Sequence, residues 1–208
     1  MPSSDPWPTI HAERKALAGD LESLNDAQWA TPSLCGDWTV RQVLGHMAAA
    51  ARTTQGGFLG KMIAAGFRFN AMSEKDVARE TQGPPSETLA RFKEQVNSSK
   101  HPPGPVDTWL GEALVHSEDI RRPLGISHSY PVGAVTRVAD FYKGSNLLIG
   151  SKKRIDGLKL QATDADWSTG DGPEVAGPAM SLVMAMTGRQ AALDDLSGEG
   201  VGTLKSRM

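Results

Sequence analysis

Glu112 and His116 are four residues apart in a segment with helical periodicity, so their side chains share one helix face, one turn apart. A carboxylate and an imidazole placed in this way can reach the same metal ion. Taken alone, the pair is weak support for a site, because helices often carry such pairs on solvated faces for a gain of about 0.2–0.5 kcal/mol. A metal site therefore requires another ligand elsewhere in the chain.

His46 is the candidate for that ligand, since it lies mid-helix beside the small residues Ala49 and Ala50, which leave space beside an imidazole. A lone histidine there is more often a hydrogen-bonded core residue. However, two imidazoles and one carboxylate form the ligand set of catalytic zinc sites, which keep a further position open. A structural site would normally use four protein ligands, often thiolates, and this chain has one cysteine. We therefore predict a divalent metal, zinc first, on His46, Glu112 and His116.

Other polar residues near these ligands allow more than one interpretation. Asp119 follows His116 by three residues and is predicted to orient its imidazole, while an ion pair with Arg122 or Arg52 is the competing interpretation. Arg122 could bind a carboxylated cofactor or substrate through paired N–H donors, although cations are favourable near any helix C-terminus. Cys35 precedes a helix with no obvious base beside it, and we interpret it as structural.

Helical spacing recurs in the segments that would position these residues: 9–29, 39–69, 87–98, 106–122 and 132–148. Thr39 and Gln42 have the spacing of a capping box at the start of the second segment, which Gly56-Gly57 or Gly60 would weaken. Proline-rich segments separate the later helices. The pattern predicts a mainly α protein with an antiparallel helical bundle over residues 1–150, and the family resemblance given below implies a four-helix bundle.

Residues 151–208 have a different pattern and are predicted to form a small α/β C-terminal extension. Residues 158–162 alternate like a half-buried strand, Asp171-Gly172 is a turn signal, and Pro178 opens a short helix that ends near Thr187. Residues 198–208 are predicted to be a loose tail. Arg189 is a catalytic candidate as an anion clamp, although an ordinary surface arginine is the better explanation.

Composition excludes several classes of function. A formal net charge of −2 and a pI near 6.2 provide no basic field for nucleic acid. The apolar stretches are shorter than the roughly 20 residues that span a bilayer, and the first residues lack the pattern of a secretory signal. We therefore expect a cytoplasmic protein without nucleic-acid or membrane partners. A homodimer is compatible with the sequence.

Two blocks of the sequence carry a family resemblance. The segments PSLCGDWTVRQVLGH (residues 32–46) and GEALVHSEDIRRPLG (residues 111–125), with Trp29 before them, resemble the mycothiol-dependent maleylpyruvate isomerase family of the DinB-like superfamily of four-helix metal proteins. Trp167, residues 172–175 and Gly188-Arg189 also resemble the ends of family members, although this C-terminal part is expected to be much shorter than that of the isomerase.

The resemblance implies that His46, Glu112 and His116 bind zinc or another divalent metal, and that mycothiol, a low-molecular-weight sugar thiol, is the cosubstrate. The expected activity is conjugation of this or a related thiol to a small electrophile, or isomerisation of a maleyl compound. Two alternatives remain open. One is a metal-dependent hydrolase or amidase of the same superfamily, in which water attacks. The other is a non-catalytic protein that binds a small molecule or uses the metal for stability.

Overall fold

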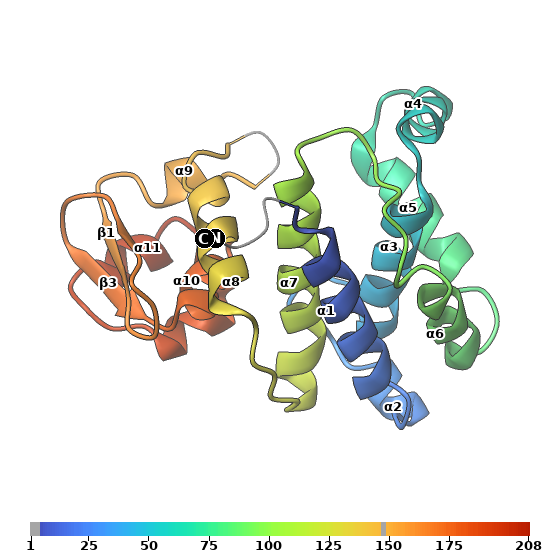
Figure 1. The fold of residues 1–208 in the computed structure, drawn as a ribbon, viewed down its shortest axis with the longest axis horizontal. Helices are drawn as coiled ribbons and strands as arrows, with labels where there is room; N and C mark the ends of the chain where they lie inside the picture. Colours follow the sequence, from blue (N-terminus) through green and yellow to red (C-terminus); the bar gives the residue numbers. More distant parts are fainter. Residues whose placement is uncertain (1–4, 147–148) are drawn as a thin grey trace. The chain divides into compact units, whose positions relative to one another are not determined.

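The computed structural model describes residues 5–146 and 149–208, which form two compact units. The N-terminal unit extends to His128, and the C-terminal unit begins at Ser129 (Figure 1). We expected a boundary at residue 150. The division comes earlier because the helix after Pro131 packs its apolar face within the C-terminal unit. The end of that helix, predicted at residue 148, lies outside the described residues.

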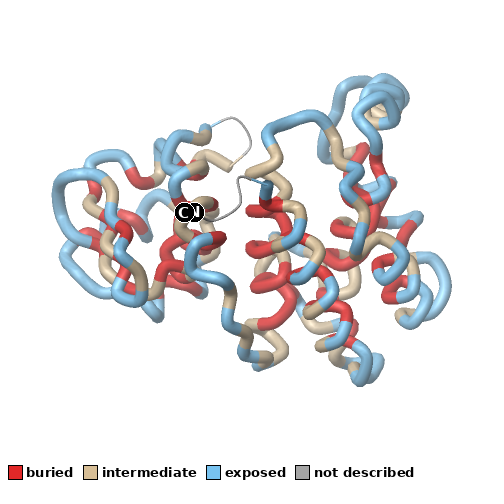
Figure 2. Tube along the Cα trace, in the orientation of Figure 1, coloured by how far each residue is buried: buried red, intermediate tan, exposed pale blue. Residues whose placement is uncertain are grey.

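The N-terminal unit is helical, as the sequence predicted. Its elements are α1 (Trp7–Asp20), α2 (Asp26–Trp29), α3 (Val40–Arg52), α4 (Gln55–Ala64), α5 (Phe69–Glu80), α6 (Pro85–Lys93), α7 (Val106–Arg121) and the short 3-10 helix η1 (Arg122–Leu124). Helices α1, α3, α6 and α7 pack into the predicted helical bundle, and α5 packs along α3. The lengthwise apolar stripes of these helices form the buried interior in Figure 2. Its fully buried members include Leu17, Leu21, Val43, Leu44, Met47, Phe92 and Ile120.

Two of the predicted helices are interrupted in the structure. The segment 9–29 divides because Asn25 caps α2, accepting a hydrogen bond from the Gln28 N–H at 2.9 Å. The segment 39–69 divides at Thr53, after which the Thr54 hydroxyl accepts from the Gly57 N–H and caps α4. The break therefore lies before the glycines that we expected to weaken this helix. Helix α5 was not predicted.

The C-terminal unit contains α8 (Val132–Tyr142), α9 (Ser151–Arg154), β1 (Lys159–Ala162), β2 (Ser168–Thr169), β3 (Glu174–Gly177), α10 (Ala179–Met186), the 3-10 helix η2 (Gln190–Asp195) and α11 (Val201–Lys205). Strand β1 lies between β2, to which it is antiparallel, and β3, to which it is parallel. Helix α10 packs on α8 and the sheet. The α/β character is confirmed, as are the strand at β1 and the helix after Pro178. The expected tail contains the helix α11.

Among the described residues, no helix has the length and apolar character that crossing a membrane would require.

Candidate metal centre

Helices α3 and α7 bring His46 and His116 together. Their ring centroids are 5.1 Å apart, and the ring planes are nearly perpendicular, at 81°. The start of α3 is fixed by the predicted capping box, because the Thr39 N–H donates to Gln42 Oε1 at 2.9 Å and the Gln42 N–H donates to the Thr39 hydroxyl. Helix α3 then buries Val43 and Met47 in the bundle core. His46 consequently lies on the neighbouring face of α3, toward α7.

Glu112 lies one turn before His116 on α7, and its carboxylate is buried without hydrogen-bond partners. The residue is 8% exposed, and neither Oε1 nor Oε2 has a hydrogen-bond partner in the structure. The nearest cation is Arg14, whose Nη2 lies 3.7 Å from Oε2, too far for a hydrogen bond. Burial raises the pKa of Glu112, and the charges of Arg14 and His116 oppose this rise.

A divalent metal fits this environment. A buried carboxylate with two unsatisfied oxygens is strongly unfavourable unless a cation compensates it. Two imidazoles and this carboxylate are also donors that zinc prefers. The side chains of His46, Glu112 and His116 are therefore donor types that suit a divalent metal. Among the described residues, however, the ligand atoms that lie within 4.8 Å of one another are those of Cys35, His116 and Asp119, so a metal on the predicted three residues stays a prediction.

His116 is held from behind by Asp119 at the end of α7. Nδ1 of His116 lies 2.9 Å from Oδ2 of Asp119, which is fully buried. Burial alone would lower the pKa of His116, but hydrogen bonds to Asp119 and then Cys35 raise the pKa to about 10. Because Asp119 engages Nδ1, a metal would be bound through Nε2. A carboxylate that holds the other ring nitrogen is the usual support of a metal-binding histidine.

His46 has a less polar environment. Its Nδ1 lies 3.3 Å from the hydroxyl of Ser73 on α5, and the Trp38 ring centroid is 5.2 Å from the His46 ring. Burial, assisted by the positive charge of His116, lowers the pKa of His46 to about 3. His46 is therefore neutral at physiological pH, which is the form that binds a metal.

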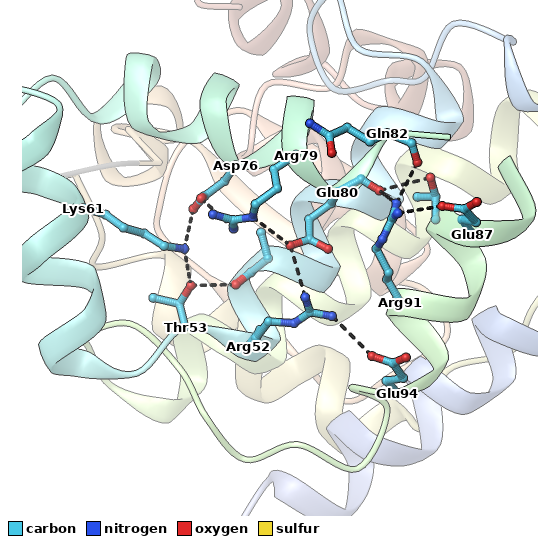
Figure 3. A network of polar contacts seen from close by, with 12 residues as sticks. Arg52, Thr53, Lys61, Asp76, Arg79, Glu80, Gln82, Glu87, Arg91 and Glu94 are labelled. Atoms are coloured by element: carbon cyan, nitrogen blue, oxygen red, sulfur yellow. Dashed lines mark hydrogen bonds and ion pairs between the residues drawn. The ribbon is translucent and has the colours of Figure 1, made fainter. Parts of the chain in front are cut away.

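Close packing of α5 against α3 brings Ser73 to His46. A Cβ atom at Gly45 would lie 2.9 Å from Cγ2 of Thr81, so glycine at this position permits the close approach. A polar network also fixes α5 (Figure 3). Asp76 accepts from Lys61 at 2.7 Å and from Arg79 at 2.9 Å. The main chain of α5 thus has little freedom where it carries Ser73.

Cys35 also belongs to this centre, contrary to our interpretation of it as a residue without a base beside it. The loop between α2 and α3 is tied to α7, since the Leu34 N–H donates to the Asp119 carbonyl at 3.1 Å. The Cys35 side chain is thereby hydrogen-bonded to His116. Sγ of Cys35 and ligand atoms of His116 and Asp119 all lie within 4.8 Å of one another. The contact joins residues 81 positions apart, so helical spacing could not reveal it.

The arginines that we considered have other contacts. Arg122 donates to Oε2 of Glu118 at 2.6 Å, one turn earlier on the helix, and Arg52 lies 3.6 Å from Glu80. Arg189 belongs to the C-terminal unit, where it donates to the Thr187 carbonyl at 3.2 Å. None of these contacts provides a clamp for a bound anion.

Two residues of the centre were missed at the sequence level. Ser73 was missed because α5 was not predicted, although Met72 and Val77 mark its buried face. Arg14 was not singled out from the sequence, yet it is 1% exposed and lies beside Glu112. Its contact depends on the packing of α1 against α7, which no local pattern encodes.

Two kinds of comparison relate this chain to known proteins. Residues 10–101 match the family model described as the mycothiol maleylpyruvate isomerase N-terminal domain. A crystal structure of the mycothiol-dependent maleylpyruvate isomerase matches with a TM-score of 0.65 and 13% identity, covering 96% of this chain and 93% of that chain. A histidine-to-alanine mutant of that isomerase matches equally well at 14% identity. None of the curated proteins matches this chain.

The structural match spans nearly the whole of the solved isomerase chain, so our expectation of a much shorter C-terminal part was wrong. At this identity the match shows the fold, which is the DinB-like helical fold that the sequence predicted. The match to the family model covers the segment that carries Cys35, His46 and Ser73. Residues 10–101 of this chain are therefore similar to the mycothiol maleylpyruvate isomerase N-terminal domain.

Proposed function

We propose that this protein is a cytoplasmic enzyme that conjugates mycothiol, or a related low-molecular-weight thiol, to small electrophiles at a metal held by His46, Glu112 and His116. Zinc is the first candidate for the metal. The observation that carries the proposal is the buried carboxylate of Glu112, whose oxygens have no hydrogen-bond partners. Glu112 lies on the same helix as His116, and the ring centroids of His116 and His46 are 5.1 Å apart. The match to the family model supports mycothiol as the thiol.

A divalent metal, when bound, would keep the thiol sulfur as a thiolate, the nucleophilic form, at a pH where a free thiol is mostly protonated. The side chains have separate tasks. Glu112 supplies negative charge, and its burial next to Arg14 keeps water from its oxygens. Asp119 fixes the ring of His116 and can accept its Nδ1 proton. His46 presents a neutral ring, since burial lowers its pKa to about 3.

Isomerisation of a maleyl compound is the narrower form of the same proposal. Addition of the thiolate to an activated double bond would permit rotation about the resulting single bond before the thiol is eliminated. Transfer would end instead with release of the adduct. The name of the matching family favours including isomerisation, and both reactions would use the same metal ligands and the same thiol.

A thiol-dependence assay tests the proposal. Zinc-loaded protein is incubated with a panel of electrophiles, including maleylpyruvate, with mycothiol, with cysteine, or without thiol. We expect turnover only with a thiol. Glu112→Gln, which removes a ligand charge, should lower turnover at least tenfold, whereas Glu199→Gln, at an exposed position of the C-terminal unit, should not. Turnover that persists after all thiol is removed would contradict the proposal and favour a hydrolase.

A further inference from the structure

In the cluster formed by Cys35, His116 and Asp119, only Cys35 has no part in the proposed reaction. The three ligand atoms of the cluster lie within 4.8 Å of one another, which is close enough to share one ion. Asp119 already serves His116 by holding Nδ1 at 2.9 Å. The loop that carries Cys35 is held by other groups, since the Leu34 N–H donates to the Asp119 carbonyl and the Cys35 N–H donates to the Ser33 hydroxyl. The sulfur is therefore left to interact with His116.

The carboxylate of Glu112 is a second group beside His116 that suits a cation, because Arg14 approaches only Oε2, at 3.7 Å, and neither oxygen has a hydrogen-bond partner of normal geometry. Glu112 is 8% exposed, has no hydrogen-bond partner for either oxygen, and interacts electrostatically with the same His116 that Cys35 contacts. The cysteine and the carboxylate therefore approach one imidazole from different elements, the loop before α3 and the helix α7. A cation bound there by Glu112 and His116 would have the Cys35 sulfur as a near neighbour.

From this arrangement we infer that Cys35 is a resting ligand of the metal, and that it occupies the position which the cosubstrate thiol takes during turnover. This inference rests on the proposed function, since it assumes the metal centre of His46, Glu112 and His116. A thiolate is a preferred donor for zinc, and a fourth protein ligand completes a tetrahedral site. Cys35 is partly exposed, so its side chain has room to leave the metal when the thiol arrives.

The exchange balances without any oxidant or reductant. The incoming thiol forms a bond from its sulfur to the metal, and the bond from Cys35 to the metal breaks. The proton of the incoming thiol ends on the sulfur of Cys35. One thiolate replaces another, so the charge of the centre does not change. Such a ligand would protect the metal from water and other donors between turnovers.

Cobalt substitution tests the inference by a spectroscopic measurement. The chain has a single cysteine, so a thiolate-to-cobalt charge-transfer band in Co²⁺-loaded protein without added thiol can only come from Cys35. We expect this band in the wild type and its loss in Cys35→Ser and Cys35→Ala. The matched control, Asp37→Asn, changes an exposed residue of the same loop without removing sulfur and should keep the band. A wild-type protein that binds cobalt without the band would overturn the inference.

Alkylation of Cys35 provides a second measurement that needs no variant. Iodoacetamide should modify Cys35 in the metal-free protein, metal should block the modification, and mycothiol added to the metal-loaded protein should restore it. Equal modification with and without metal would contradict the inference. Modification that stays blocked after mycothiol is added would contradict the exchange.

The same samples distinguish failure of the inference from failure of the proposed function. If the thiolate band is absent until mycothiol is added, Cys35 is not a ligand but the thiol does bind the metal, and the proposed function stands. If Cys35 gives the band and mycothiol neither displaces it nor produces a band in Cys35→Ser, the resting ligand stands and the proposed function fails.

Discussion

On the α7 side of the metal centre a buried carboxylate holds His116, whereas on the α3 side a neutral hydroxyl from α5 approaches His46. The contact between His116 Nδ1 and Asp119 Oδ2 is 2.9 Å long, and that between His46 Nδ1 and Ser73 Oγ is 3.3 Å long. The consequences for protonation are opposite. Burial lowers the pKa of His46 to about 3, while at His116 burial is outweighed by bonds to Asp119 and Cys35, and the pKa rises to about 10.

This difference means that, in the metal-free protein across the physiological range, His46 is neutral and His116 is the protonated, positively charged imidazole. His46 is ready to bind a metal, whereas His116 must first release its proton. After that release, the charge on Asp119 makes His116 the more basic of the two ligands. If the proposed metal binds, the α7 side would strengthen its bond to the protein, and the α3 side would provide a neutral donor.

The largest effect should come from removing either histidine. If both sides bind one ion, His46→Ala and His116→Ala should each lower metal affinity by more than about 100-fold, beyond the usual effect of losing an orienting partner. His11→Ala, at a half-buried histidine on α1, should leave the affinity unchanged. Elemental analysis of dialysed protein measures the outcome. Full metal content in His46→Ala would show that the ion belongs to the α7 side alone.

Asp119→Asn should have the next largest effect, because it removes the charge behind His116 and keeps the size of the side chain. We expect metal affinity to fall by about 10- to 100-fold. Asp37→Asn, at an exposed position in the loop that carries Cys35, is the matched control and should not change affinity. Competition with a chelator of known affinity measures both. An unchanged affinity in Asp119→Asn would mean that the carboxylate serves only the fold.

The pH dependence of metal binding sharpens the contrast between the two histidines. Since the pKa of His116 is about 10 without metal, binding at lower pH must displace its proton. Affinity should therefore rise at least about tenfold for each pH unit between pH 6 and 9, while His46, with a pKa of about 3, adds no proton in this range. Calorimetry in buffers of different ionisation enthalpy counts the protons released. Release of none would contradict the protonation of His116.

The sequence predicted the α7 half of this comparison better than the α3 half. Glu112, His116 and Asp119 lie within eight residues of one helix, so helical periodicity alone places them together. The capping box of α3 was likewise local and was confirmed. Helical periodicity predicts the face of a helix on which a residue lies. It does not predict which other helix packs against that face.

The partners of His46 and the contact of Cys35 depend on packing between distant segments. Ser73 reaches His46 because Gly45 lets α5 lie close to α3. Helix α5 mixes polar and apolar residues, and polar contacts such as that of Lys61 with Asp76 hold it in place. Cys35 reaches His116 through a loop that is tied to α7 by a main-chain bond. These contacts arise from tertiary structure, as does the earlier boundary between the two units.

Ser73→Ala should give the smallest effect, and it tests whether the hydroxyl positions His46 or only fills space. The bond is neutral and longer than that of Asp119, and charge-assisted bonds are roughly twice as strong as neutral ones. We therefore expect metal affinity to fall by less than about tenfold. Ser73→Thr, which keeps a hydroxyl, should restore part of it, and Ser86→Ala, at an exposed position on α6, should have no effect.

A change in affinity alone would not separate positioning from packing, whereas the tautomer of His46 does. If Nδ1–H donates to the Ser73 hydroxyl, Nε2 is left with the lone pair that a metal needs. Nitrogen chemical shifts of the metal-free protein should then report protonation at Nδ1 of His46 in the wild type and a mixture of tautomers in Ser73→Ala. The same tautomer ratio in both proteins, with a lower affinity in the variant, would mean that Ser73 acts through packing.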